Sequence, residues 1–264
     1  MPILSDFSPE QVKDIAREMD MHGYARLENA LSAAELEQLR DFTDSRAARH
    51  PGEYFAYHGE TALADSLLAS LWADTTVKQL LADLYRHAAG QTSSSSQIFP
   101  VLRCVQGDVG RRESNCFHYD ASLVTALIPI HIPVDGKECG DLMLFPNLRK
   151  VRDNVVFNVI EKSLMQNRFS RWLTCQAIEH GWAKPRVLKL NPGDIYLFWG
   201  YRTLHANQPC SPNLKRATAI LHYGDPHNGS TATRLILGLN QRRAARRSAR
   251  TNIAASETTP RQQP

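Results

Sequence analysis

Two histidines and one aspartate in this sequence have the residue types and the order of a metal site. His118 and Asp120 are separated by one residue, and His205 lies far along the chain. In an extended segment, side chains at positions i and i+2 point to the same side, so His118 and Asp120 can reach one ion while Tyr119 points away. Two imidazoles and one carboxylate form the facial triad that holds Fe(II) and leaves coordination positions open for chemistry. The three residues are therefore the candidate iron ligands and, through the iron, the candidate catalytic residues.

The segments next to these ligands have the composition of β-strands. Residues 122–133 are apolar and β-branched, which predicts a buried strand with Pro129 at a bulge or an edge. Residues 187–190 and 195–199 predict two more strands, joined by the turn residues 191–194. His205 follows close behind. The sequence therefore places both halves of the metal site at the ends of strands.

A strand that follows His205 carries a candidate anion receptor. Residues 207–213 contain two prolines and two asparagines, which mark a reversal, so a strand from Arg216 to Tyr223 can return beside His205. Arg216 and Thr218 would then share one face of that strand and enter the metal cavity. A guanidinium with a neighbouring hydroxyl is a good receptor for a terminal carboxylate, such as that of 2-oxoglutarate. A surface salt bridge is the alternative for Arg216.

The same motifs occur in a known order. They are His118-Tyr119-Asp120, then Cys139 to Pro146 with the pattern Gly-x-Leu-x-x-x-Pro, then Pro192-Gly193-Asp194, then His205 and Arg216. This order, together with the segment Gly23 to Leu36, resembles the phytanoyl-CoA dioxygenase-like family of Fe(II)/2-oxoglutarate oxygenases. The likeness covers roughly residues 7–225.

The resemblance implies a fold and a set of cofactors. The fold would be α+β, with a double-stranded β-helix core (jelly-roll, cupin-like) buttressed by N-terminal helices. His118, Asp120 and His205 would bind Fe(II), Arg216 with Thr218 would bind the far carboxylate of 2-oxoglutarate, and O2 would be the second co-substrate. Related halogenases carry a small residue in place of the carboxylate. Asp120 therefore favours hydroxylation, desaturation or cyclisation over halogenation.

Two polar residues precede the metal pair on another expected strand. Strand alternation places Gln97 and Arg103 on one face. Members of the family often place a polar side chain here against 2-oxoglutarate, so we expect Gln97 to contact the co-substrate. A buried arginine without an anionic partner is costly. Arg103 is therefore a candidate substrate contact whose orientation stays open.

Two arginines lie where this chain departs from the family pattern. Many members carry Pro-Gly-Ser-His after the Gly-x-Leu strand, but this chain has Pro146-Asn147-Leu148-Arg149. A guanidinium suits a carboxylate, so Arg149 and Arg152 are candidate substrate contacts at the rim of the cavity. A solvated basic turn is the alternative.

These features together predict oxidation of an unactivated C–H bond. The expected substrate is a small polar metabolite, such as an amino acid or a biosynthetic intermediate, and succinate and CO2 are released. Two alternatives stay open: an oxygenase that acts on a nucleic acid or another macromolecule, and a non-catalytic metal-binding cupin-like protein. The second alternative has no use for Arg216 and Thr218 beside the histidines. The sequence leaves the oligomeric state open.

Length and charge predict one folded domain followed by a basic tail. The 264 residues suit a single domain, which we place at residues 1–240. Residues 241–264 contain six arginines and one glutamate, so 25 basic and 26 acidic residues remain in the rest of the chain. The composition of the tail favours disorder. No aromatic residues are interleaved with its arginines, so we do not expect a nucleic-acid contact.

The cysteines, the apolar runs and the first residues of the chain bear on where in the cell the protein is expected. The five cysteines are odd in number and include no Cys-x-x-Cys pair, which favours free thiols. No apolar run is long enough to cross a bilayer, and the first residues lack the pattern of a signal peptide. We therefore expect a cytoplasmic protein without a membrane contact.

The N-terminal part of the chain has the start and stop signals of helices. Ser8-Pro9 predicts a helix to about Met21 that ends at Gly23, and Ser32 to Glu35 form a capping box for a helix to about Ala48. Residues 61–72 and 75–88 predict two further helices. Helices thus precede strands, which is the α+β order of one domain.

Overall fold

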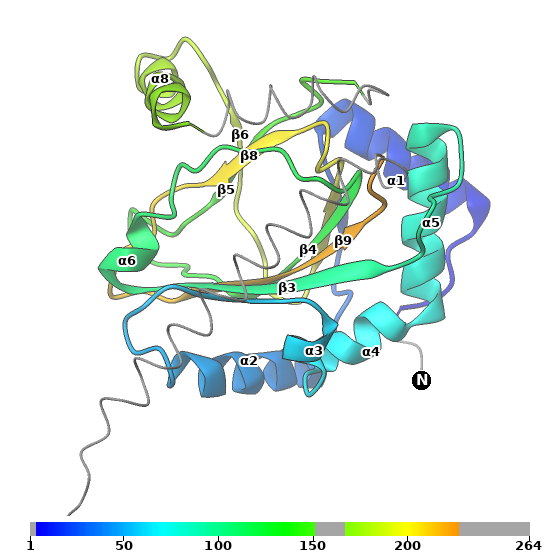
Figure 1. Ribbon diagram of the computed structural model, residues 1–264, viewed down its shortest axis with the longest axis horizontal. Helices are drawn as coiled ribbons and strands as arrows, with labels where there is room; N and C mark the ends of the chain where they lie inside the picture. Colours follow the sequence, from blue (N-terminus) through cyan, green and yellow to red (C-terminus); the bar gives the residue numbers. More distant parts are fainter. Residues whose placement is uncertain (1–3, 151–166, 227–264) are drawn as a thin grey trace, which may run out of the picture. The chain divides into compact units, whose positions relative to one another are not determined.

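The computed structural model describes residues 4–150 and 167–226, and all of its described elements belong to one compact unit, residues 1–226 (Figure 1). Arg152 and the tail at residues 241–264 lie outside the described residues. The strands are β1 (Ala25–Leu27), β2 (Phe55–His58), β3 (Ile98–Val105), β4 (Val124–His131), β5 (Leu142–Phe145), β6 (Arg186–Leu188), β7 (Ile195–Phe198), β8 (Leu204–Asn207) and β9 (Arg216–Tyr223). The helices are α1 (Pro9–His22), α2 (Ala33–Ala47), α3 (Glu60–Leu63), α4 (Leu67–Ala73), α5 (Thr75–Ala89), α6 (Gly107–Arg111) and α8 (Arg168–Glu179).

Two antiparallel sheets form the core of the fold. The large sheet has six strands in the order β1-β7-β4-β9-β3-β2, and the small sheet has three in the order β6-β5-β8. All strand pairs in both sheets are antiparallel. The register between β4 and β9 shifts between Pro129 and His131, which is the irregularity that a proline inside a strand predicts. This arrangement is the double-stranded β-helix that the family resemblance implied.

The two faces of the large sheet pack against different partners. On β4, Val124, Ala126 and Ile128 belong to the core shared with the helices, whereas Leu127 belongs to a cluster with residues of the small sheet. Because side chains alternate along a strand, a sheet covered on both faces needs apolar residues at nearly every position. This requirement explains why residues 122–133 are mostly apolar.

The same alternation places polar residues of β9 inside the sandwich. Ala217, Ala219, Leu221 and Tyr223 pack in the core shared with the helices. The intervening residues of β9 therefore face the small sheet. Figure 1 shows β5, β6 and β8 on one side of β3 and β9, and α2, α3 and α4 on the other side. The interior between the sheets is where the polar residues of β9 meet.

The helices follow their sequence signals closely, with one exception. Ser8 and Ser32 form the capping boxes of α1 and α2, and Gly23 ends α1 in the left-handed conformation. The single helix predicted at residues 61–72 is wrong, because the chain forms α3 and α4 with a break between them. Ser66 has extended backbone angles at this break, and its hydroxyl donates to the Leu63 carbonyl at 2.6 Å. Serine side chains compete with helical backbone bonds in this way.

Among the described residues, no helix has both the length and the apolar character that a membrane span requires.

Candidate active site

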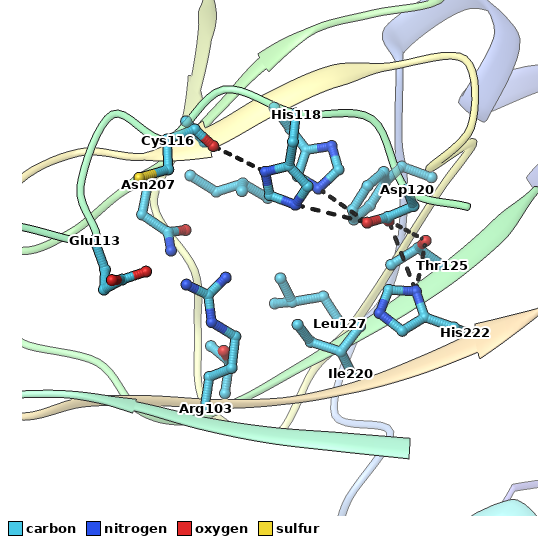
Figure 2. Close-up of a pocket in the computed structure, with 15 residues that line it drawn as sticks. Arg103, Glu113, Cys116, His118, Asp120, Thr125, Leu127, Asn207, Ile220 and His222 are labelled. Atoms are coloured by element: carbon cyan, nitrogen blue, oxygen red, sulfur yellow. Dashed lines mark hydrogen bonds and ion pairs between the residues drawn. The ribbon is translucent and has the colours of Figure 1, made fainter. Parts of the chain in front are cut away.

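His118, Asp120 and His205 meet at one end of the space between the sheets (Figure 2). The Nε2 atoms of His118 and His205 lie 3.7 and 3.6 Å from Oδ1 of Asp120. One ligand atom from each residue lies within 4.8 Å of the other two. Two imidazole nitrogens and one carboxylate oxygen at this separation can bind one ion on a single face.

The backbone brings the two histidines together directly. His118 and His205 are partners in an isolated antiparallel bridge, and each backbone N–H donates to the carbonyl of the other at 3.0 Å. Their ring centroids are 4.3 Å apart. Asp120 is joined to the same region because its backbone N–H donates to the Gly200 carbonyl at 3.0 Å. Residues far apart in the sequence thus form one site through ordinary strand pairing.

Hydrogen bonds from the second ring nitrogen fix the tautomer of each histidine. Nδ1 of His118 donates to the Cys116 carbonyl at 2.8 Å, and Nδ1 of His205 donates to the Thr203 carbonyl at 3.0 Å. Because a carbonyl can only accept, the proton of each neutral ring is on Nδ1 and the lone pair on Nε2 is free. Metal-bound histidines in proteins are commonly oriented by such a bond.

The ionisation states of the triad suit a cation. Burial, followed by the nearby His205, lowers the pKa of His118 to about 4, so the ring is neutral at neutral pH. Burial alone would raise the pKa of Asp120, but the adjacent His205, His222 and His118 hold it well below its usual range. The hydroxyl of Thr125 also donates to Oδ2 of Asp120 at 2.6 Å. The site therefore presents a neutral imidazole at His118 and a carboxylate at Asp120.

Gly200 allows the chain to pass close to this carboxylate. A Cβ atom at this position would collide with Oδ2 of Asp120 and Oγ1 of Thr125. The absence of a side chain at Gly200 therefore makes room for the hydrogen bond between the two residues.

His222 lies beside the triad but outside the group of converging ligand atoms. Its Nδ1 is 3.7 Å from Oδ2 of Asp120 and 2.9 Å from the hydroxyl of Ser122. Burial lowers the pKa of His222. Its position on β9, at alternate residues from Thr218, was a signal in the sequence that this histidine faces the interior.

The triad borders a cavity that is lined by both polar and apolar residues. The cavity measures about 480 Å³, including space that is open to solvent. Its lining outside the triad consists of Arg103, Glu113, Cys116, Thr125, Leu127, Leu142, Phe198, Ala206, Asn207, Thr218, Ile220 and His222. Both polar and apolar side chains therefore line the space beside the triad.

Arg216 lies deeper than the cavity wall, on the same inner face as Thr218. Thr218 lines the cavity, whereas Arg216 is 2% exposed and is not part of the lining. Its Nε and Nη2 atoms are buried and have no hydrogen-bond partner. Burial, followed by the positive charge of Arg103, lowers the pKa of Arg216 to about 10, so the guanidinium stays charged at neutral pH. A buried cation with unused donors is a fitting receptor for an anion.

Gly140 makes room for this arginine. It has a φ of +74°, which favours glycine, and a Cβ atom there would collide with Cδ of Arg216. Glycine in the Gly-x-Leu segment is therefore required both by the backbone conformation and by the close approach of Arg216.

Arg103 faces the cavity from β3. It pairs with Thr218 across β3 and β9, and paired residues of antiparallel strands share a face. Figure 2 shows its guanidinium pointing into the space below His118, near Asn207 and Glu113. Its central carbon lies 5.7 Å from the ring centroid of Tyr54. The orientation that the sequence left open is thus inward.

The structure places Gln97 away from the cavity, which corrects the expectation that it contacts the co-substrate. Gln97 is exposed, precedes the first residue of β3, and donates from its amide to Glu60 at 3.4 Å. Six residues of extended chain span about 20 Å, so sharing a face with Arg103 does not bring Gln97 to the same end of the strand.

Arg149 also lies outside the cavity lining, in contrast to the expected substrate role. It is 6% exposed, and its guanidinium lies over the rings of Tyr119 and Tyr201, 4.1 and 3.9 Å from their centroids. Its Nε donates to the Tyr201 carbonyl. Arg149 therefore packs between two aromatic rings and is neither a solvated turn residue nor a cavity residue.

The polar cavity residues Glu113, Asn207 and Thr125 were not singled out from the sequence. Glu113 and Asn207 reach the site from the ends of α6 and β8, and Thr125 reaches it from β4. Thr125 stands out as the polar residue of an apolar strand, which is a usable signal. Glu113 and Asn207 lie in polar stretches where the sequence carries no such signal.

Comparison with known proteins supports the fold. No protein-family model matches the chain, and no curated protein sequence matches it. A solved structure of a prolyl 4-hydroxylase from Phytophthora capsici is 14% identical, with a TM-score of 0.54 over 86% of this chain and 70% of that chain.

Two enzymes of nogalamycin biosynthesis are similar to the same degree. The epimerase SnoN is 15% identical, with a TM-score of 0.53 over 83% of this chain and 82% of its own. The carbocyclase SnoK is 16% identical, with a TM-score of 0.52 over 84% of this chain and 87% of its own. Both are described as non-heme, α-ketoglutarate-dependent enzymes. The chain therefore shares its fold with 2-oxoglutarate-dependent oxygenases.

Proposed function

We propose that this chain is an Fe(II)/2-oxoglutarate-dependent dioxygenase that oxidises an unactivated C–H bond of a small polar metabolite. The observation that carries the proposal is the convergence of His118, Asp120 and His205 on one point of a double-stranded β-helix. The resemblance of the motif order to the phytanoyl-CoA dioxygenase-like family, and the similar folds of SnoN and SnoK, support it further.

The residues fit the proposed metal. Nε2 of His118, Nε2 of His205 and Oδ1 of Asp120 would hold Fe(II). The neutral state of His118 and the anionic state of Asp120 at neutral pH are those that a divalent cation needs. Bound Fe(II) with 2-oxoglutarate and O2 supplies the oxidising power for C–H cleavage, with succinate and CO2 as by-products.

The residues also fit the proposed co-substrate. Arg216 would bind the distal carboxylate, because its unpaired Nε and Nη2 lie behind Thr218 on the inner face of β9. The hydroxyl of Thr218 would donate to the same carboxylate. Leu127, Leu142 and Phe198 would exclude water from the space between this carboxylate and the triad.

Hydroxylation is the outcome that we favour, with desaturation or cyclisation as variants of the same C–H cleavage. What this chain contributes is positioning: the triad fixes the metal, Arg216 fixes the co-substrate, and the cavity holds the substrate near both. The family's own substrate is not carried over, because the segment Pro146-Asn147-Leu148-Arg149 differs from the family pattern.

The test combines binding and turnover on the full-length chain. Calorimetry under anaerobic conditions measures 2-oxoglutarate binding with and without Fe(II), and succinate release is then measured across a panel of amino acids, acyl thioesters and other metabolites. We expect metal-dependent 2-oxoglutarate binding, and succinate release that rises with one class of substrate. In Asp120→Ala, metal binding and turnover should fall by more than about 100-fold. Full activity of Asp120→Ala, or an equal affinity for 2-oxoglutarate with and without Fe(II), would refute the proposal.

A further inference from the structure

We propose that the substrate of this site is a small zwitterion of the amino acid class, whose carboxylate is bound by Arg103 and whose ammonium group is bound by Glu113. This inference rests on the proposed function and adds the substrate class to it. It is carried by two oppositely charged side chains that enter the same cavity without pairing with each other.

Arg103 has no acidic partner among the described residues, although it enters a partly enclosed cavity. Its ring contact is with Tyr54, and it takes part in none of the ion pairs within residues 4–150 and 167–226. A half-buried guanidinium has lost part of its hydration, so an anion that binds to it recovers free energy. The free donors of Arg103 therefore point to an anionic ligand.

Binding of 2-oxoglutarate would neutralise Arg216 but would leave the positive charge of Arg103 without a partner. 2-Oxoglutarate has two carboxylates, of which one would bind to the iron and the other to Arg216. Arg103 is a second guanidinium, close enough to Arg216 for its charge to disfavour the charged form of that residue. Two neighbouring cations are best stabilised by two anions. The second anion is then a group of the substrate.

Glu113 supplies the opposite charge on the same wall of the cavity. It follows α6, and Figure 2 shows its carboxylate beside the space into which Arg103 and Asn207 point. Its near neighbour Arg111 forms an ion pair with Glu138 at 2.5 Å, whereas Glu113 has no such partner within the described part of the chain. Since Glu113 and Arg103 do not neutralise each other, a ligand with one positive and one negative group can pair with both.

The apolar residues of the cavity lining indicate the chemistry of the rest of the substrate. Figure 2 shows Leu127 and Ile220 beside Arg103, on the side toward His222, and Phe198 and Leu142 add to the apolar lining. Such a surface packs against hydrocarbon and not against further charges. The carbon that faces the metal ligands would therefore belong to an aliphatic part of the substrate, distant from its ammonium and carboxylate groups.

The experiment measures binding, so that it does not depend on turnover. The full-length protein is loaded anaerobically with Fe(II) and saturating 2-oxoglutarate, which blocks Arg216, and is titrated by calorimetry with the common amino acids and their shorter and longer homologues. Each ligand that binds is compared with its methyl ester, which lacks the carboxylate, and its N-acetyl derivative, which lacks the ammonium group. The variants are Arg103→Gln and Glu113→Gln, with Arg17→Gln and Glu10→Gln on the exposed surface of α1 as matched controls.

We expect at least one aliphatic amino acid to bind, and each derivative to bind about 10- to 100-fold more weakly. Arg103→Gln should lose the preference for the acid over the ester, and Glu113→Gln the preference for the amine over the amide. Both variants should keep wild-type affinity for 2-oxoglutarate, and the two surface controls should bind every ligand like the wild type.

Three results would overturn the inference. The first is that no amino acid binds, and the second is that neutral derivatives bind as tightly as zwitterions. The third is that Arg103→Gln weakens 2-oxoglutarate and leaves amino acid binding intact, which would make Arg103 part of the co-substrate receptor. Failure of the proposed function is distinguishable, because in that case the wild-type protein would not bind 2-oxoglutarate in a metal-dependent manner in the same titration series.

Discussion

The triad and the buried arginine behind the cavity wall differ in how their polar groups are satisfied. At the triad, the Nδ1 atoms of His118 and His205 donate to backbone carbonyls, and Asp120 accepts from Thr125. Behind the cavity wall, by contrast, two nitrogens of the buried Arg216 have no partner. The chain itself therefore orients the groups proposed to hold the metal, but it leaves the groups proposed to hold organic anions incomplete.

This difference has a thermodynamic meaning. A buried polar atom without a partner costs free energy, and a buried charge costs more. Such violations of ordinary packing rules are concentrated at functional sites, where a ligand restores the missing interactions. We infer that bound 2-oxoglutarate would stabilise the fold more than a ligand bound to solvent-exposed groups would. The reason is that it would supply partners for the buried nitrogens of Arg216, whose burial without partners costs free energy.

The largest expected effect comes from replacing Arg216, the buried cation whose donors lack partners. Arg216→Met should weaken 2-oxoglutarate binding by tens to hundreds of fold, since a charge-assisted pair worth about 2 to 4 kcal/mol is lost. The free energy of unfolding of the ligand-free variant should be unchanged or higher, by up to about 2 kcal/mol, because methionine carries no charge to bury. Urea unfolding with and without 2-oxoglutarate measures both effects.

Arg26 provides the matched control for this prediction. Its Nε donates to the buried Asp194 at 2.6 Å, so its guanidinium already has a partner. Arg26→Met should destabilise the ligand-free protein and leave 2-oxoglutarate affinity unchanged. If Arg216→Met destabilises the ligand-free protein as much as Arg26→Met does, the contrast between the triad and Arg216 is wrong.

The next prediction concerns the triad, whose polar groups already have hydrogen-bond partners within the chain. Thr125→Val removes the hydroxyl that donates to Asp120 at nearly constant volume, and we expect Fe(II) affinity to fall by about 10- to 100-fold. Thr125→Ser keeps the donor and should restore most of the affinity. Anaerobic competition with a coloured chelator measures the affinity. Equal Fe(II) affinity in the valine variant and the wild type would show that this hydrogen bond does not organise the site.

A smaller effect is expected from acid on the metal-free protein. Burial and His205 lower the pKa of His118 from 6.5 to about 4, so below pH 6.5 the unfolded chain takes up a proton that the folded chain does not bind. Stability should therefore fall as the pH is lowered from about 6.5 to about 4. Burial lowers the pKa of His222 and of His58 as well, which adds to the same trend.

Urea unfolding of the metal-free chain at several pH values measures this dependence. His118→Gln removes one of the groups involved and should give a shallower decline over the same interval. A decline of equal slope in the variant would mean that His118 does not contribute to it.

The smallest effect on the site is expected at Arg149. Arg149→Gln removes a cation that lies between Tyr119 and Tyr201, and should lower the free energy of unfolding by about 1 to 2 kcal/mol. Affinity for 2-oxoglutarate and the KM of any substrate found should stay at wild-type values. A raised KM with unchanged stability would instead restore the substrate role that the sequence suggested for this residue.

Local signals in the sequence predicted most of the framework. The capping boxes at Ser8 and Ser32 and the apolar run of β4 are short-range patterns, and the structure has the corresponding elements. His118 and Asp120 were predicted to point the same way because strand alternation is also local. The break at Ser66 was missed because one serine does not outweigh the helical pattern around it.

Long-range placement explains the remaining differences. Strand alternation predicts which side chains of the β3 segment share a face, but it does not predict which end of the strand reaches the cavity, so the expected position of Gln97 was wrong. Arg149 could not be interpreted without knowing that Tyr119 and Tyr201 meet around it. Glu113 enters the cavity through a loop whose path depends on the whole sandwich. Each of these residues depends on contacts that no local pattern contains.

The bridge between His118 and His205 also has a consequence for the order of events during folding. These residues are neighbours only after β8 has joined the segment before β4, which closes a long loop of chain at an entropic cost. In the unfolded chain the ligand pair at His118 and Asp120 has no third partner, so metal binding selects the closed state. The stabilisation rises with the logarithm of the metal concentration once that concentration exceeds the dissociation constant. Metal binding would thus be a late step of folding, and the bound ion would hold the two ends of this loop together.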